Sequence, residues 1–256
     1  MTDNQKVFDI LGVPVNACTL NEAIAKIDIS IAARKNLHIG VVNAAKIVNM
    51  GRDTELRQSV LESDLILADG VAVVWASKLL GKSLPERVTG IDLMYAMFEQ
   101  GNAKQYRVFC LGATEEVLSR VAEILSQNYP NIVLAGKQNG YFDQDEEEEL
   151  AKKIADSRAD ILLVAMTSPK KERFMAKWNA TMNVPVIHGV GGSFDVMSGK
   201  VQRAPELWQK LGLEWLYRVK QEPKRLWRRY LVTNSIFCWL TLKAVFSRFL
   251  PSARNT

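Results

Sequence analysis

Cysteine and histidine are scarce in this chain of 256 residues, with three copies of the first and two of the second. The cysteines, Cys18, Cys110 and Cys238, lie far apart, and no CxxC pair occurs. This spacing excludes a disulfide framework and a Cys/His zinc site, and it suits a reducing compartment. His38 and His188 both stand within apolar runs, so we expect them in the core rather than in catalysis.

Two nucleotide-binding fingerprints are also missing. Neither GxGxxG nor GxxxxGK[ST] occurs, which argues against a dinucleotide-dependent oxidoreductase and against a P-loop protein. The N-terminal stretch has an early acidic residue and no apolar segment, so we expect no secretory signal. Hydrophobic residues make up 48% of the chain and charged residues 24%, which is typical of a globular protein.

Charge is distributed unevenly along the chain. From Lys200 onward, twelve basic residues face three acidic ones, a net charge of +9, which leaves −4 for residues 1–199. A mildly acidic body with a basic, aromatic-rich end is typical of a protein that docks on an anionic partner, such as nucleic acid, phospholipid or a diphosphate. We therefore expect two parts, a catalytic body over 1–199 and a basic, helical appendage over 200–256.

Short apolar runs alternate with helical patterns through the body. The predicted strands are Leu37–Val42, Leu65–Ala68, Val108–Leu111, Ile132–Ala135, Ile161–Ala165 and Val184–Val190, with a strand or hairpin at Val7–Val15. The predicted helices are Leu20–Ala33, Val71–Leu80, Glu115–Gln127, Asp145–Ser157 and Lys170–Ala180, with a further one beginning near Asn43. This alternation predicts an α/β, Rossmann-like fold, with a mainly parallel sheet and helices on both of its faces.

The last predicted helix differs in kind. Pro223 suits the first position of a helix, and neither Gly nor Pro follows until Pro251. The segment Lys224–Leu250 holds six aromatic residues, but polar side chains interrupt its centre, which makes it too polar for a typical membrane span. An amphipathic helix in the membrane interface fits better. An ordinary helix packed on the body and a single span over Tyr230–Phe246 are the alternatives.

Polar or glycine-rich turns follow five of the predicted strands. They begin at Asn43, Asp69, Leu111, Met166 and Gly189. Ligands of open α/β sheets bind outside the carboxyl ends of the strands, so these turns predict one site. Gly191 and Gly192 would let backbone amides approach a phosphate.

Asp69 is a candidate general base because it stands at a strand end. A helix N-cap for Val71–Leu80 is an equally good interpretation of the same residue. Asp92 and Asp195 are competing carboxylates, and each could equally be a capping or ion-pairing residue.

Eight short elements occur in order along the chain. They are Asn43-Ala-Ala-Lys46, Ala68-Asp-Gly70, Arg87-Val-Thr-Gly-Ile-Asp-Leu93, Ser168-Pro-Lys-Lys-Glu172, Gly189-Val-Gly-Gly-Ser-Phe-Asp195, Arg203-Ala-Pro-Glu-Leu-Trp208, Gly212-Leu-Glu-Trp-Leu-Tyr-Arg218 and Pro223-Lys-Arg225. Together they resemble the WecG/TagA/CpsF family of glycosyltransferases (glycosyltransferase family 26), over about Phe8 to Arg229.

The resemblance implies an inverting glycosyltransferase that uses a UDP-sugar of the N-acetylmannosamine, N-acetylmannosamine uronate or glucose type. The acceptor would be a sugar on a polyprenyl diphosphate, in the assembly of a bacterial cell-surface polysaccharide. We expect no metal or other cofactor, no nucleic-acid partner, and a cytoplasmic enzyme peripheral on the inner face of the membrane. Association of like chains is left open. A non-catalytic basic module that docks on membrane or nucleic acid is the alternative.

The resemblance also implies roles for particular residues. Asp69 matches the family's proposed base. The expected substrate-binding residues are Asn43, Arg87, Ser168, Lys171, Gly191, Gly192 and Asp195. Basic residues of the appendage that would reach the acceptor diphosphate and the membrane are Arg218, Arg225 and Arg228.

Two positions depart from the family pattern. Val41 stands where some members have threonine, and Lys171 stands where glutamine is usual. These changes predict a donor that is not restricted to N-acetylmannosamine. A buried cation needs a partner, so Lys171 should face a carboxylate of the protein or an anionic group of the ligand. A solvated surface lysine is the alternative.

Overall fold

The computed structural model describes residues 6–249, and its central element is a six-stranded sheet in the order β4-β3-β8-β7-β5-β6. Every pair of neighbouring strands in this sheet is parallel. The strands are β3 (Leu37–Val42), β4 (Leu65–Ala68), β5 (Arg107–Gly112), β6 (Val133–Gln138), β7 (Ile161–Ala165) and β8 (Val186–Gly189). The predicted α/β fold with a parallel sheet is confirmed.

The N-terminal strand prediction resolves into a hairpin outside this sheet. Strands β1 (Val7–Ile10) and β2 (Val13–Asn16) pair antiparallel. The two residues between them, Leu11 and Gly12, have φ values of 54° and 79°. Two left-handed residues in succession are what a two-residue hairpin turn of type I′ requires.

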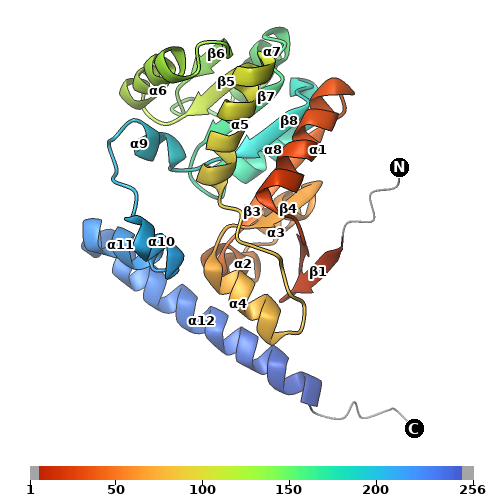
Figure 1. Cartoon of the computed structure of the whole chain (residues 1–256), viewed down its shortest axis with the longest axis vertical. Helices are drawn as coiled ribbons and strands as arrows, with labels where there is room; N and C mark the ends of the chain where they lie inside the picture. The colour runs from red at the N-terminus through yellow and green to blue at the C-terminus, as the bar shows by residue number, and fades with distance from the viewer. Residues whose placement is uncertain (1–5, 250–256) are drawn as a thin grey trace.

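Helices cover both faces of the sheet (Figure 1). On one face lie α1 (Leu20–Ala32), α5 (Gly90–Lys104), α6 (Glu115–Asn128) and α9 (Ser193–Met197). On the other lie α2 (Ala44–Met50), α3 (Thr54–Leu61), α4 (Val71–Leu79), α7 (Glu147–Asp156) and α8 (Lys170–Met182). Side chains alternate between the faces, so that Leu163 packs in one core cluster and Leu162 in another. Burial on both faces explains the continuous apolar runs of the strands.

Three helices follow the sheet, namely α10 (Glu206–Lys210), α11 (Glu214–Gln221) and α12 (Pro223–Phe249). Helix α12 runs along one side of the body and packs against α2 and α4 (Figure 1). Leu226, Phe237 and Thr241 are buried on its inner side, and Phe237 joins the core cluster of α2 and α4. Leu250, the predicted last residue of this helix, lies outside the described residues.

The turn between α10 and α11 packs tightly on the body. Gly212 has a φ of +70°, and a Cβ added there would lie 2.3 Å from Val71 Cγ1 on α4. Only glycine combines this left-handed conformation with so close an approach. The appendage is thus fitted against the first turn of α4, beside the carboxyl end of β4.

Candidate active site

A cavity of about 410 Å³ opens at the carboxyl ends of β3 and β4. Its walls come from these strand ends, from the first turns of α2 and α5, from the first half of α4, and from the segment between Val196 and Cys238. The body and the appendage therefore close the cavity together. Of the residues expected in the site, four line it, namely Asn43, Asp69, Arg87 and Arg218.

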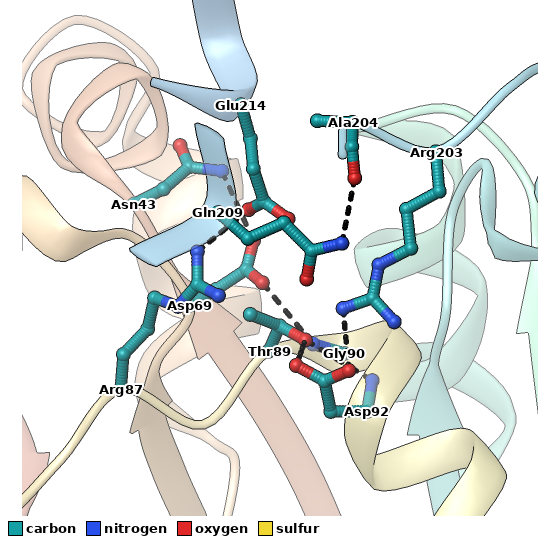
Figure 2. Close-up of polar contacts among 10 residues, drawn as sticks. All are labelled: Asn43, Asp69, Arg87, Thr89, Gly90, Asp92, Arg203, Ala204, Gln209 and Glu214. Atoms are coloured by element: carbon teal, nitrogen blue, oxygen red, sulfur yellow. Dashed lines mark hydrogen bonds and ion pairs between the residues drawn. The ribbon is translucent and has the colours of Figure 1, made fainter. Parts of the chain in front are cut away.

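Asp69 is held in this cavity by two donors. Its carboxylate accepts a hydrogen bond from the Gly90 amide at 3.1 Å, and one from Asn43 Nδ2 at 3.4 Å (Figure 2). Asn43 is itself fixed, since its Oδ1 caps α2 by accepting from the Lys46 amide. Helix α4 begins after Gly70 with no side-chain cap, so Asp69 does not cap it. The interpretation of Asp69 as a cap of that helix is wrong.

His188 contacts the backbone of Gly90, the residue whose amide donates to Asp69. The imidazole is fully buried, and burial lowers its pKa to about 4. Its Nε2 lies 3.2 Å from the Gly90 carbonyl. Its Nδ1 lies 3.5 Å from the Ile39 carbonyl, and the neutral ring donates from only one of its two nitrogens. The shorter distance favours donation from Nε2 to the carbonyl of Gly90. The prediction that His38 and His188 belong to the core is confirmed.

Three arginines line the cavity, Arg87, Arg203 and Arg218. Arg87 donates to Glu214 at 2.6 Å, and Arg203 forms an ion pair with Asp92 (Figure 2). Arg218 is exposed and has no ion-pair partner among residues 6–249. Several guanidiniums around one space suit an anionic ligand, because the planar fork binds phosphate oxygens in pairs.

The chain matches the model of the glycosyl transferase WecG/TagA/CpsF family over residues 8–250. It belongs to this family. A relative from Bacillus spizizenii (strain ATCC 23059 / NRRL B-14472 / W23) is 41% identical over 175 residues, which cover 68% of this chain and 67% of the relative. That relative is an N-acetylglucosaminyldiphosphoundecaprenol N-acetyl-beta-D-mannosaminyltransferase. The chain is therefore a glycosyltransferase, and the alternative of a non-catalytic module is wrong.

Two residues of the glycosyltransferase's cavity, Arg203 and Glu214, were not expected there. Both stand in short elements that carry the family resemblance, which is the signal that could have found them. Arg203 Nε is buried and has no hydrogen-bond partner in the described part of the chain. Asp92 caps α5 with Thr89 and pairs with Arg203, so its capping and ion-pair interpretation is confirmed.

Other expected site residues lie along the same edge of the sheet but do not line the cavity. Ser168 is exposed after β7, and the Gly191 amide donates to the Val164 carbonyl at 3.3 Å. Gly192 is exposed, and Asp195 Oδ1 lies 3.7 Å from Lys200 Nζ. On α12, Arg228 is exposed, and the side chain of Arg225 lies outside the described part of the structure.

Lys171 lies in a buried cluster of charged side chains and does not line the cavity. Its Nζ is 2.7 Å from Glu172 Oε1, and Lys46 Nζ is 2.8 Å from the same oxygen. Lys171 is 7% exposed, so the interpretation as a solvated lysine is wrong, and its partner is a carboxylate of the protein. Burial lowers the pKa of Lys171 to about 8. Burial acts to raise the pKa of Glu172, but the two lysines outweigh it and lower that pKa to about 2.

Glu172→Gln is expected to lower the free energy of unfolding by about 3–5 kcal/mol, because it leaves the buried Lys171 and the largely buried Lys46 without a carboxylate. Lys171→Met is the matched control. This variant removes one of the two cations while Lys46 still neutralises Glu172. We therefore expect a much smaller decrease in the free energy of unfolding. Urea denaturation of both variants measures the difference. If the two variants lose equal free energies of unfolding, removing Glu172 costs no more than removing one of its lysine partners, which contradicts this expectation.

Proposed function

We propose that the enzyme moves a sugar from a UDP-sugar to a sugar carried on a polyprenyl diphosphate, in the assembly of a bacterial cell-surface polysaccharide. The relative's name supports this acceptor class, since it contains diphosphoundecaprenol. The observation that carries the proposal is the cavity itself. It combines one carboxylate at a strand end, Asp69, with three guanidiniums.

In the proposed reaction Asp69 is the general base. It takes the proton of the acceptor hydroxyl as that oxygen attacks the anomeric carbon, and the bond from this carbon to the UDP oxygen breaks with inversion. Negative charge develops on the departing UDP. Arg87 and Arg203 would stabilise this charge, as fixed cations do best in a site partly shielded from water.

The nucleotide of the donor would extend from the cavity along the strand ends. Strand β8 neighbours β3 in the sheet, so the turn at Gly191 and Gly192 follows the strand next to Asn43. The roles of these two glycines, and of Ser168 and Asp195, in donor binding stay predictions. Lys171 is engaged by Glu172, and its part in binding would be indirect.

The donor sugar is proposed to be of the N-acetylmannosamine, uronate or glucose type. Neither Val41 nor Lys171 lines the cavity, so their departures from the family pattern give no particular support to an anionic sugar. The experiment that tests the function is a screen of these UDP-sugars with an N-acetylglucosaminyl diphosphate lipid, following UDP release. We expect turnover with UDP-N-acetylmannosamine, the sugar in the relative's name. Release of UDP from none of the three would contradict the proposal.

We further propose that the enzyme is peripheral on the inner face of the membrane. Leu226–Arg248 is long and apolar enough to cross a bilayer by length and composition. One side of this helix, however, packs on α2 and α4, so a span would carry part of the body into the lipid. Large apolar side chains are exposed on its outer side. They are Trp227, Leu231, Trp239, Leu242 and Phe246. An interfacial position would bury this outer side and leave the packing intact.

Chelators are expected to leave turnover unchanged. The charge of the departing UDP would be met by Arg87 and Arg203, which need no metal. The measurement is UDP release with and without EDTA, at saturating donor. A loss of activity that magnesium or manganese restores would show that the arginines alone do not stabilise the leaving group.

A further inference from the structure

The cavity is polar at one end and apolar at the other. Asn43, Asp69 and Arg87 gather at the strand ends. Away from them the walls are formed by apolar and aromatic side chains of α4 and of the appendage. These are Val71, Ala72, Trp75, Trp215, Tyr230 and Phe237, with Asn234 and Cys238 of α12 beside them. The apolar part is thus a crevice between α4 and α12, and we call it the α4–α12 crevice.

This crevice is continuous with the apolar surface of the molecule. Trp75 belongs to its wall and is also 55% exposed, and Leu79, one turn further along α4, is 61% exposed. On the other wall, Phe237 is buried at 3% exposure while Trp239 two residues on is 66% exposed. The crevice therefore leads from the surface proposed to face lipid toward the carboxylate of Asp69.

A nucleobase or a sugar face can stack on the aromatic side chains of the α4–α12 crevice, but the polar groups of these ligands gain little there. Their hydroxyl and phosphate groups would lose water there without finding enough hydrogen-bond partners, which is costly. A ligand that fills the whole cavity must instead be polar at one end and hydrocarbon at the other. A polyprenyl diphosphate sugar has this form.

We propose that the α4–α12 crevice binds the first isoprene units of the acceptor lipid, so that this part of the chain leaves the bilayer and lies within the protein. The proposal rests on the proposed function, because that function supplies the acceptor. The remaining isoprene units would stay in the bilayer beyond Trp75. Arg218 lines the same cavity and would meet the diphosphate between the two ends.

Soluble acceptor analogues test this subsite without any membrane. N-acetylglucosaminyl diphosphate would be prepared with a methyl, dimethylallyl, geranyl or farnesyl tail, and kcat and KM would be measured for each. We expect KM to fall by roughly tenfold or more from methyl to geranyl, since each buried methylene is worth about fourfold in affinity. Beyond the length that the crevice holds, KM should level off.

Two variants separate the crevice from the outer surface of α12. Ala72→Trp fills the crevice, so it should remove the dependence of KM on tail length. Trp239→Ser changes only an exposed side chain outside the crevice. It should keep the tail-length dependence while it weakens binding to anionic vesicles.

Labelling of Cys238 gives a readout that does not depend on turnover. Its thiol is exposed and lines the crevice, whereas Cys18 and Cys110 are buried, so maleimide should label this cysteine selectively. The geranyl analogue should slow labelling at least tenfold relative to the methyl analogue, and Cys238→Ser should abolish the signal.

Equal KM values and equal labelling rates for the methyl and geranyl analogues would overturn the proposal. Protection of Cys238 by the geranyl analogue, without UDP release from any donor, would support the subsite and count against the proposed function. The two ideas can therefore fail separately.

Discussion

Replacing Asp69 with asparagine is expected to lower kcat by about 10²- to 10⁴-fold, the range typical of a lost general base. Asparagine has nearly the same shape, and its amide oxygen can still accept the hydrogen bond from the Gly90 amide. The α/β body and the binding of UDP should therefore be unchanged. Stopped assays of UDP release give kcat, and titration calorimetry gives the affinity for UDP.

Glu206→Gln is the matched control for this experiment. Glu206 is an exposed carboxylate at the start of α10, and its nearest ion-pair contact is Lys210 at 3.7 Å. Its loss should leave kcat near that of the wild type. If Asp69→Asn stays within tenfold of the wild type, about 1.4 kcal/mol in the barrier, the base lies elsewhere. Asp195 would then be the next carboxylate to replace.

Several elements could be predicted from the sequence because local pattern and burial agree there. Leu65–Ala68 and Ile161–Ala165 have the bounds of β4 and β7, since short apolar runs are what strands buried on both faces look like. No helix is predicted over α5, although Leu93, Met94, Met97 and Phe98 follow helical spacing and are buried. Its first turn lies within Arg87–Leu93, an element that the sequence suggests only as part of a site.

The site was predictable only in part. The rule that ligands bind at strand ends found Asn43 and Asp69, which the structure brings within hydrogen-bonding distance. Arg203 and Glu214 come from the segment after the sheet, and their position depends on tertiary packing that no local pattern encodes. Lys171 illustrates the opposite case. It stands in a site motif, but it shares the buried side of α8 with Phe174 and Met175, so its side chain turns away from the cavity.

Ending the chain after Gln221 is expected to abolish vesicle binding and to lower turnover by at least about 100-fold. The truncation removes α12 and with it Tyr230, Phe237 and Cys238 of the cavity wall.

The truncation also removes Phe237 from a core cluster, where the loss of such a side chain alone costs about 3–5 kcal/mol. Two other core clusters contain no residue of α12, so we expect a less stable body that still binds UDP. Circular dichroism and UDP titration check the body. The division into a body over 1–199 and an appendage over 200–256 stays a prediction, because the truncated chain keeps residues 200–221.

A surface variant distinguishes the two ways in which α12 would contribute. Replacing Trp239, Leu242 and Phe246 with serine removes exposed apolar groups and leaves the buried side of the helix unchanged. Vesicle binding should fall, because these side chains would enter the interface. Turnover of a short, soluble acceptor should stay near that of the wild type, because the cavity keeps all its walls. The truncated chain should lose turnover even on that soluble acceptor. If both proteins turn it over equally well, α12 serves only to bind the membrane, and the cavity does not need the appendage for catalysis.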